Sequence, residues 1–297
     1  MRVPNPLQKG DHIQIVAPAK RIDASHVHQT KEILENEGFE ISISEHCLGG
    51  HHYFSGTLEE RLKDLQSALD NPEVDAILCA RGGYGCVQLV DLIDWSAFNE
   101  KPKWIIGFSD VTVLHQHLQN KGIASIHGTM PLNFGTHAPE SLSTLLNALH
   151  GTSYLIEAPF HDQNVLGEVE AHLIGGNLAI IASLIGTNDQ PSFTDCILFV
   201  EEIGEPLYSV DRMFYSLKKA GILDQIKGLV VGGMTSMKDS EILYGSTLEE
   251  IILTHTKYLN IPVTFDFPAG HIDDNRALVF GATVKLSIHS HGTVLKF

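Results

Sequence analysis

The sequence has few cysteines and no pattern that would pair them. Only 4 of its 297 residues are cysteine, and no two of them have C-x-x-C spacing. Cys79 and Cys196 lie in apolar runs, which is typical of buried free thiols in a reducing cytoplasm. The chain is long enough for two domains, and 43% of it is apolar, so we expect a sizeable hydrophobic core.

Positive charge is also scarce. The chain has 20 Lys and Arg against 36 Asp and Glu, a formal net charge of −16. This balance argues against nucleic acid or an anionic membrane as the main partner. No apolar run reaches the roughly 20 residues that span a bilayer. The polar, proline-containing segment 1–11 is not typical of a secretory signal, so we expect a cytoplasmic protein.

The first half of the chain alternates between predicted strands and helices. The apolar patterns predict strands at 12–17, 39–44, 74–80 and 104–106, and helices at 24–37, 57–69, 86–93 and from 110 onward. Thr57 and Glu60 have the spacing of a capping box. This alternation predicts an α/β fold with a parallel sheet, in which ligands bind at the carboxyl ends of the strands.

After Gly128 the pattern changes, and shorter strands begin near residue 151. We place the domain boundary near 150–165, with one domain at 1–155 and a second, strand-rich domain at 165–297. A helix at 141–150 is predicted to end the first domain. The second half is predicted to hold helices at 178–185, 209–220 and 247–258, strands at 196–200 and 229–232, and a terminal hairpin within 277–297.

Ser109 lies in the turn that begins at Gly107 and connects the predicted strand at 104–106 to the following helix. A serine there has its hydroxyl at the carboxyl edge of the sheet, close to helix-start amides that favour negative charge, as in a nucleophile elbow. The alternative is an ordinary helix N-cap, which is the commoner role for serine at such a place. Val111 also replaces the second glycine of G-x-S-x-G.

The segment from Arg81 to Gly85 has three glycines directly after a predicted strand. It lacks the lysine of a phosphate-binding P-loop and the spacing of a dinucleotide fingerprint. It is either a plain turn or an oxyanion site, where a glycine N–H and the N–H of Asp110 would receive a substrate oxygen.

Glu201 and Glu202 follow another apolar strand, and His271 follows Gly270. The order Ser109, Glu201, His271 is the chain order of the α/β-hydrolase triad. The alternatives are a solvated carboxylate, help at a helix start, an ion pair with Arg212, and a plain surface histidine.

A metal site is the main rival to a triad. The candidate pairs are His26 and His28, His51 and His52, His115 and His117, and His289 and His291. No H-E-x-x-H helix or carboxylate partner accompanies them, so we expect no metal.

Five motifs, taken together, carry a resemblance to a known family. They are Arg81 to Gly85, Gly107 to Thr112, Gly175 to Leu178, Val200 to Pro206, and Gly270 with His271. In this order they resemble the LD-carboxypeptidases of peptidoglycan recycling, a serine peptidase family that includes the microcin-immunity peptidases. The resemblance spans nearly the whole chain.

The resemblance implies a Rossmann-like N-terminal domain, a strand-rich C-terminal domain, an active site between them and a homodimer. It places the nucleophile at Ser109, the acid at Glu201 and the base at His271, with Glu202 as the fallback acid. The oxyanion donors would be the N–H of Gly82 or Gly83 and that of Asp110. No cofactor is implied.

The implied reaction removes terminal D-alanine from cytoplasmic murein tetrapeptides, at the L-centre of a diamino acid. Arg81 and Tyr84 are candidates for binding the substrate, and for Arg81 a structural salt bridge is the alternative. Two other functions stay open. A microcin-immunity peptidase would use an aromatic-bearing loop, whereas the stretch 188–193 has no Trp or Tyr. A small-ligand-binding protein would use Ser109 only as a cap.

Overall fold

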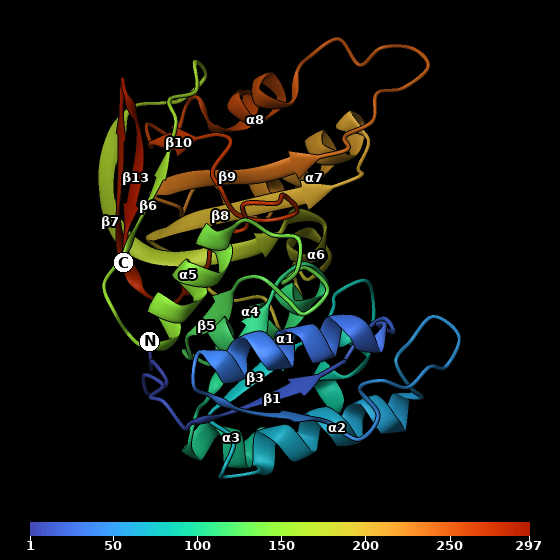
Figure 1. Cartoon of the computed structure of the whole chain (residues 1–297). Helices are drawn as coiled ribbons and strands as arrows, with labels where there is room; N and C mark the ends of the chain where they lie inside the picture. Colours follow the sequence, from blue (N-terminus) through green and yellow to red (C-terminus); the bar gives the residue numbers. More distant parts are fainter.

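The computed structural model describes residues 1–297, which form two sheets with helices packed against them (Figure 1). The first sheet has the order β11-β5-β4-β3-β1-β2. Its strands are β1 (His12–Val16), β2 (Glu40–Ile43), β3 (Ala76–Cys79), β4 (Trp104–Gly107), β5 (Ser125–His127) and β11 (Leu278–Phe280). All neighbours are parallel except β11, which pairs antiparallel with β5. The α/β fold is therefore confirmed, and one edge of this sheet comes from the far end of the chain.

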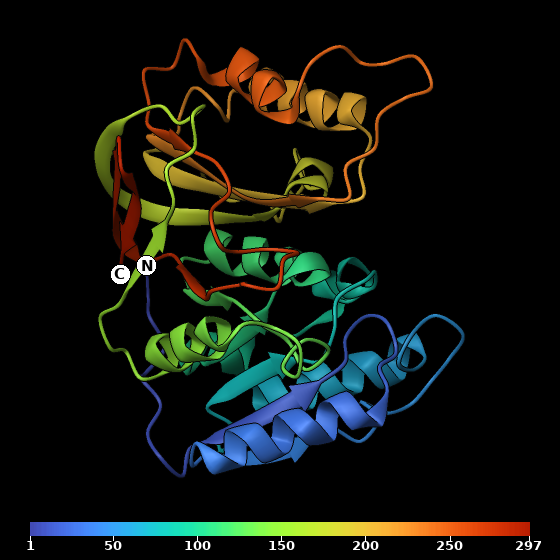
Figure 2. The same cartoon turned by 45° about the horizontal axis from the view of Figure 1, so that its top comes forward.

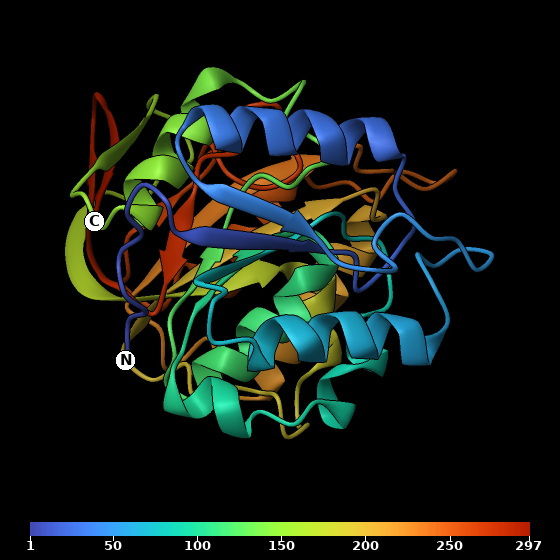
Figure 3. The same ribbon diagram turned by 60° about the horizontal axis from the view of Figure 1, so that its bottom comes forward.

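Apolar side chains cover both faces of the first sheet. Alternate residues of β1, β3 and β4 point to opposite sides and join two separate buried clusters. Helices α1 (Ala24–Asn36) and α2 (Leu58–Asp70) lie on opposite faces of the sheet (Figure 3). The Thr57–Glu60 capping box is confirmed at the start of α2. Further helices are α3 (Ser96–Glu100), α4 (Thr112–Asn120) and α5 (Pro139–Leu149).

The helix predicted at 86–93 is wrong. The segment forms two short 3₁₀ turns instead, η1 (Cys86–Gln88) and η2 (Val90–Leu92). The backbone N–H groups of Leu89 and Leu92 bond three residues back, to Cys86 and Leu89. The N–H of Cys86 is bound by the carboxylate of Asp110, 2.9 Å away. The helical spacing of apolar residues is real, but this tertiary contact fixes the start of the segment and the tight turns bury Leu89 and Val90.

The second sheet is mixed and has the order β10-β9-β8-β7-β12-β13-β6. Its strands are β6 (Leu155–Ala158), β7 (Gly167–Asn177), β8 (Cys196–Ile203), β9 (Gly228–Thr235), β10 (Val263–Thr264), β12 (Thr283–His289) and β13 (Gly292–Lys296), and its helices are α6 (Leu178–Ser183), α7 (Leu207–Lys219) and α8 (Leu248–Thr256). The predicted terminal hairpin is confirmed as β12 and β13, which pair antiparallel. None of the helices has the length and hydropathy needed to cross a bilayer.

Helix α4 joins the two halves, because it lies between the two sheets (Figure 2). Thr112 Oγ1 accepts a hydrogen bond from the backbone N–H of Asn177 at 3.0 Å, and Gln116 Nε2 donates to the carbonyl of Gly175 at 2.9 Å. Gly176 has no room for a side chain, since a Cβ there would lie 2.5 Å from Thr112. These contacts hold the start of α4 against the carboxyl end of β7, beside the end of β8.

Candidate active site

Ser109 has a strained backbone at the junction between β4 and α4. Its φ is +63°, in the left-handed region that residues with a side chain rarely adopt. The turn Ser109–Val111 has no side-chain cap, and neither has α4, so the structure does not support the N-cap alternative. Such strain costs about 1–3 kcal/mol and clusters at functional sites. The serine is half-buried and lines a cavity.

The glycine-rich turn 81–85 lies directly against Ser109. A Cβ on Gly82 would be 2.8 Å from Ser109 Cβ, 3.0 Å from its Oγ and 3.2 Å from the backbone N of Asp110. Only glycine fits this approach. Gly83, with a φ of +110°, is turned toward Tyr53, whose hydroxyl would lie 2.8 Å from a Cβ there. Gly82 is therefore the residue next to the hydroxyl.

The side chain of Asp110 ties the two turns together. Its Oδ2 accepts the backbone N–H of Cys86 at 2.9 Å, and the carboxylate is 2% exposed. Burial raises the pKa of Asp110 above its ordinary value. The carboxylate thus fixes the glycine turn relative to Ser109, and the backbone nitrogen of Asp110 lies beside Gly82.

Glu201 and His271 form a hydrogen-bonded pair in which the glutamate is buried and the histidine is partly exposed. Glu201 is at the carboxyl end of β8 and is fully buried, and its Oε2 lies 2.5 Å from His271 Nδ1. Burial pulls the pKa of His271 down, but the charge and hydrogen bond of Glu201, with Glu202 adding, raise it overall. A carboxylate on Nδ1 leaves the other ring nitrogen, Nε2, available to exchange a proton with a substrate group.

A tight turn presses His271 onto Glu201. Gly270 has a φ of +107°, and a Cβ there would lie 2.6 Å from Glu201 Cβ. Its backbone N–H donates to Asn275 Oδ1 at 2.7 Å, and Asn275 is fully buried. The sequence analysis missed Asn275, because nothing in the segment that follows His271 distinguishes it from an ordinary loop asparagine.

Glu202 points away from His271 toward a helix start. Its carboxylate accepts the backbone N–H of Ala179 at 2.8 Å and the side-chain amide of Asn177 at 3.0 Å. It therefore satisfies orphan donors at the start of α6. Arg212 pairs with neither glutamate and donates to Ser209 instead. The geometry thus favours Glu201, and not the fallback, as the partner of His271.

Ser109 and His271 line one cavity of about 340 Å³ at the carboxyl ends of the first sheet. Its wall is formed by Lys20, Tyr53, Arg81, Gly82, Gly83, Phe108, Ser109, Met130, Leu132, Asn133, Ile203 and His271. The rings of Phe108 and His271 are 5.0 Å apart. No hydrogen bond joins Ser109 to His271; catalytic bonds of this kind are often long until substrate is bound.

The two proposed substrate-binding residues differ in position. Arg81 lines the cavity and donates to the carbonyl of Arg21 at 3.3 Å. Tyr84 does not line it; its side chain is 48% exposed, and its ring lies 6.3 Å from that of Phe54. The sequence analysis missed Lys20 and Tyr53, whose ring lies 5.1 Å from Lys20 Nζ.

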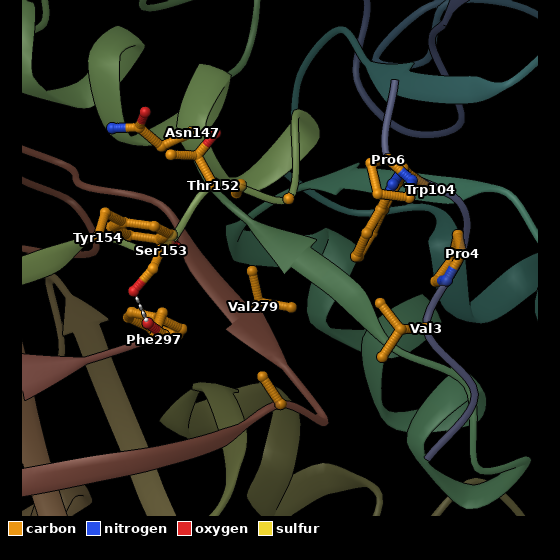
Figure 4. Close-up of a pocket in the computed structure, with 13 residues that line it drawn as sticks. Val3, Pro4, Pro6, Trp104, Asn147, Thr152, Ser153, Tyr154, Val279 and Phe297 are labelled. Atoms are coloured by element: carbon orange, nitrogen blue, oxygen red, sulfur yellow. Dashed lines mark hydrogen bonds between the residues drawn. The ribbon is translucent and has the colours of Figure 1, made fainter. Parts of the chain in front are cut away.

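A second cavity, of about 240 Å³, lies near both chain ends and is mostly apolar (Figure 4). Trp104, Tyr154 and Phe297 line it, and Ser153 Oγ donates to the backbone oxygen of Phe297 at 2.7 Å. No histidine and no acidic or basic side chain lines this cavity. It therefore lacks the groups that would activate a serine.

No three His, Cys, Asp or Glu side chains converge in a way that could hold a metal ion. Both members of one histidine pair singled out in the sequence have other partners. His115 bonds to Ser125 and to the carbonyl of Gly107, and His117 pairs with Asp189 at 2.7 Å.

The mixed α/β fold, with Ser109 and His271 lining one cavity, is that of a serine-type hydrolase. Residues 13–128 match the family model of the LD-carboxypeptidase N-terminal domain, and residues 170–286 match that of its C-terminal domain. The chain belongs to the LD-carboxypeptidase family and is a serine-type carboxypeptidase.

Relatives of known name cover almost the whole chain. The murein tetrapeptide carboxypeptidase of Pseudomonas aeruginosa is 32% identical over 92% of this chain and 92% of its own. The crystal structure of muramoyltetrapeptide carboxypeptidase from Oxalobacter formigenes has a TM-score of 0.88 at 29% identity, covering 96% and 98%. The microcin C7 self-immunity protein of Escherichia coli is 26% identical over 76% of each chain.

Proposed function

We propose that this protein removes the terminal D-alanine from murein tetrapeptides, by hydrolysing the amide at the L-centre of the preceding diamino acid. The observation that carries the proposal is the Glu201–His271 pair in the same cavity as the strained Ser109. The names of the relatives in Pseudomonas and Oxalobacter support this substrate class.

In this mechanism Ser109 attacks the scissile carbonyl carbon while Nε2 of His271 takes the hydroxyl proton. Glu201 holds the imidazole in the right tautomer and stabilises the imidazolium that forms. His271 then gives the proton to the nitrogen of the departing D-alanine, and an acyl-enzyme remains on Ser109. Water, with its proton taken by His271, attacks this ester and regenerates the serine.

The tetrahedral intermediate needs donors for its negative oxygen. We assign this role to the backbone N–H groups of Gly82 and Asp110, because the close approach of Gly82 puts it beside both Ser109 Oγ and the N of Asp110. The N–H of Gly83 is the alternative donor within the same turn. Either glycine leaves the backbone accessible to a substrate oxygen.

An exopeptidase must also recognise the free carboxylate of the leaving residue. Arg81 is the candidate, since a guanidinium binds a carboxylate through two parallel hydrogen bonds and this one lines the cavity. We place the reaction in the cytoplasm, because all four cysteines are buried free thiols. A homodimer, expected from the family resemblance, is tested by light scattering of the purified chain.

The test compares the products released from a murein tetrapeptide and from a peptidyl-adenylate analogue. We expect free D-alanine and the tripeptide from the first and no cleavage of the second. The only aromatic residue in 188–193 is Phe193, which is 2% exposed and packed in a core, so it offers no surface for a nucleobase. Preferred cleavage of the peptidyl-adenylate would favour the microcin-immunity type. Binding of both without cleavage would favour a non-catalytic ligand-binding protein.

A further inference from the structure

A cavity of about 690 Å³ adjoins the cavity of Ser109. Lys20 and Arg81 line both cavities, so the two are contiguous, while Arg21 and the loop 48–50 line only the second. The start of α1 and the loop after β2 meet here, on the right in Figure 1. We call this second space the cationic cavity, after Lys20, Arg21 and Arg81.

The charge around the cationic cavity is opposite to that of the protein. The chain has a net charge of −16 and only 20 Lys and Arg, yet three of them gather here, with Asp23 as the one acidic lining residue. None of the three cations takes part in a salt bridge, although 36 carboxylates are available in the chain. Unpaired neighbouring cations repel one another, so an anion that binds between them gains Coulomb energy.

The backbone around the cations also suits an anion. Helix α1 begins at this cavity, with Asp23 as its N-cap and Ala24 as its first residue, and no side chain caps it. The backbone N–H groups of its first turn carry partial positive charge. On the other side lies Gly50, where a Cβ would be 3.8 Å from Arg21 Cδ. Arg21 itself is exposed, so its guanidinium is accessible to an anion.

We propose that the cationic cavity binds a carboxylate of the acyl part of the substrate, with Arg21 as the specificity-determining residue. This rests on the proposed function. In a murein stem peptide, the γ-linked glutamate before the diamino acid leaves its own α-carboxylate free. Two extended residues span about 7 Å, so this group lies well away from the scissile bond, and the adjoining cationic cavity offers it a site. The carboxylate of the leaving D-alanine is closer to the scissile bond and stays with the first cavity.

The test crosses two variants with two substrates. One tetrapeptide carries the free α-carboxylate on its γ-linked glutamate, and the other carries an α-amide there. For Arg21→Gln we expect KM for the carboxylate peptide to rise about tenfold with kcat nearly unchanged, because a charge-assisted hydrogen bond is lost away from Ser109. KM for the amide peptide should not change. Arg21→Lys should recover part of the loss, since it keeps the charge without the bidentate geometry.

A matched control separates local recognition from net charge. Lys257→Gln makes the same change in net charge at an exposed position just after α8, outside the cationic cavity. It should leave KM unchanged for both peptides. A rise in KM that is equal for both peptides in Arg21→Gln, or no rise for either, would overturn the proposal.

Failure of the subsite and failure of the proposed function give different results. If the parent chain cleaves neither tetrapeptide, the proposed function fails. Calorimetric titration of the Ser109→Ala variant with the two peptides then tests whether the cationic cavity binds the α-carboxylate. Tighter binding of the carboxylate peptide that is lost in Ser109→Ala/Arg21→Gln supports the subsite, and equal affinities, or no binding of either peptide, overturn it.

Discussion

The two halves of the candidate active site are built in different ways. Ser109 belongs to a continuous stretch of strand, turn and helix, and its position follows from local backbone geometry. The Glu201–His271 pair joins residues 70 positions apart, and burial and a hydrogen bond hold it together. The first half depends on a strained turn, and the second depends on the assembly of the second sheet. Substitutions in the two halves should therefore affect catalysis, stability and pH dependence in different ways.

Ser109→Ala should have the largest effect, because it removes the attacking atom. We expect kcat for D-alanine release to fall at least about 10⁴-fold. The fold should persist, since alanine meets the same backbone strain as serine. Ser153→Ala, in the apolar cavity, is the control and should keep full activity. Substantial hydrolysis by the Ser109→Ala variant would reduce Ser109 to a structural residue.

Glu201→Gln should break the other half. We expect a loss in kcat of about 10⁴-fold, because an amide cannot hold the catalytic tautomer of His271. Glu202→Gln is the matched control one residue away. It should keep most of kcat but lower the melting temperature, because the start of α6 loses a charged acceptor. The reverse pattern would make Glu202 the catalytic acid.

Gly82→Ala tests whether the glycine turn beside Ser109 contributes to catalysis. The added methyl group would collide with Ser109 and displace the oxyanion donors, so we expect kcat to fall about 10²- to 10³-fold. Gly128→Ala is a milder control, because its Cβ would have no contact shorter than 3.5 Å. Equal kcat values for the two variants would contradict the assignment of Gly82 as an oxyanion donor.

The dependence on pH reports on the histidine half. Burial lowers the pKa of His271, but Glu201 and Glu202 raise it overall above 6.5. Only the neutral imidazole is a base, so kcat/KM should fall about tenfold per pH unit below the raised pKa. The free energy of unfolding depends on pH in the opposite direction. The stabilisation from the protonated His271 beside Glu201 is fully present below pH 6.5 and is lost as pH rises through the raised pKa.

Two measurements check the pH prediction. The first is the profile of kcat/KM between pH 5 and 9, which should not be flat from 5 to 8. The second compares the free energy of unfolding of the parent and His271→Gln across the same range. The stability difference should shrink as pH rises. A difference that grows with pH would contradict the raised pKa.

Metal removal should have the smallest effect. No ligand set converges in either half of the site, so EDTA should leave the rate unchanged. The measurement is D-alanine release before and after dialysis against the chelator. Activity that is lost and then restored by zinc would contradict the serine mechanism proposed for both halves.

Much of the fold could be predicted from the sequence because the signals are local. Apolar periodicity predicted most strands and helices of the first sheet, and Thr57 with Glu60 predicted the start of α2. The segment 86–93 could not be predicted in this way, because the carboxylate of Asp110 binds its first N–H. Periodicity also could not place β11, since residues 278–280 leave the terminal hairpin and pair with a strand about 150 residues earlier.

By itself the sequence determined that the chain is acidic, is an α/β protein, and has a serine at a strand-to-helix turn. These properties depend on composition and on neighbours within one or two turns of the chain. Only the tertiary structure decided that Glu201 faces His271 while Glu202 binds the start of α6, because adjacent side chains on a strand point to opposite faces. It also decided that Asn275 supports the histidine turn and that Lys20, Arg21 and Arg81 surround one cavity. The Glu201–His271 contact and the cationic cavity join segments that are remote in sequence, and only packing brings those segments together.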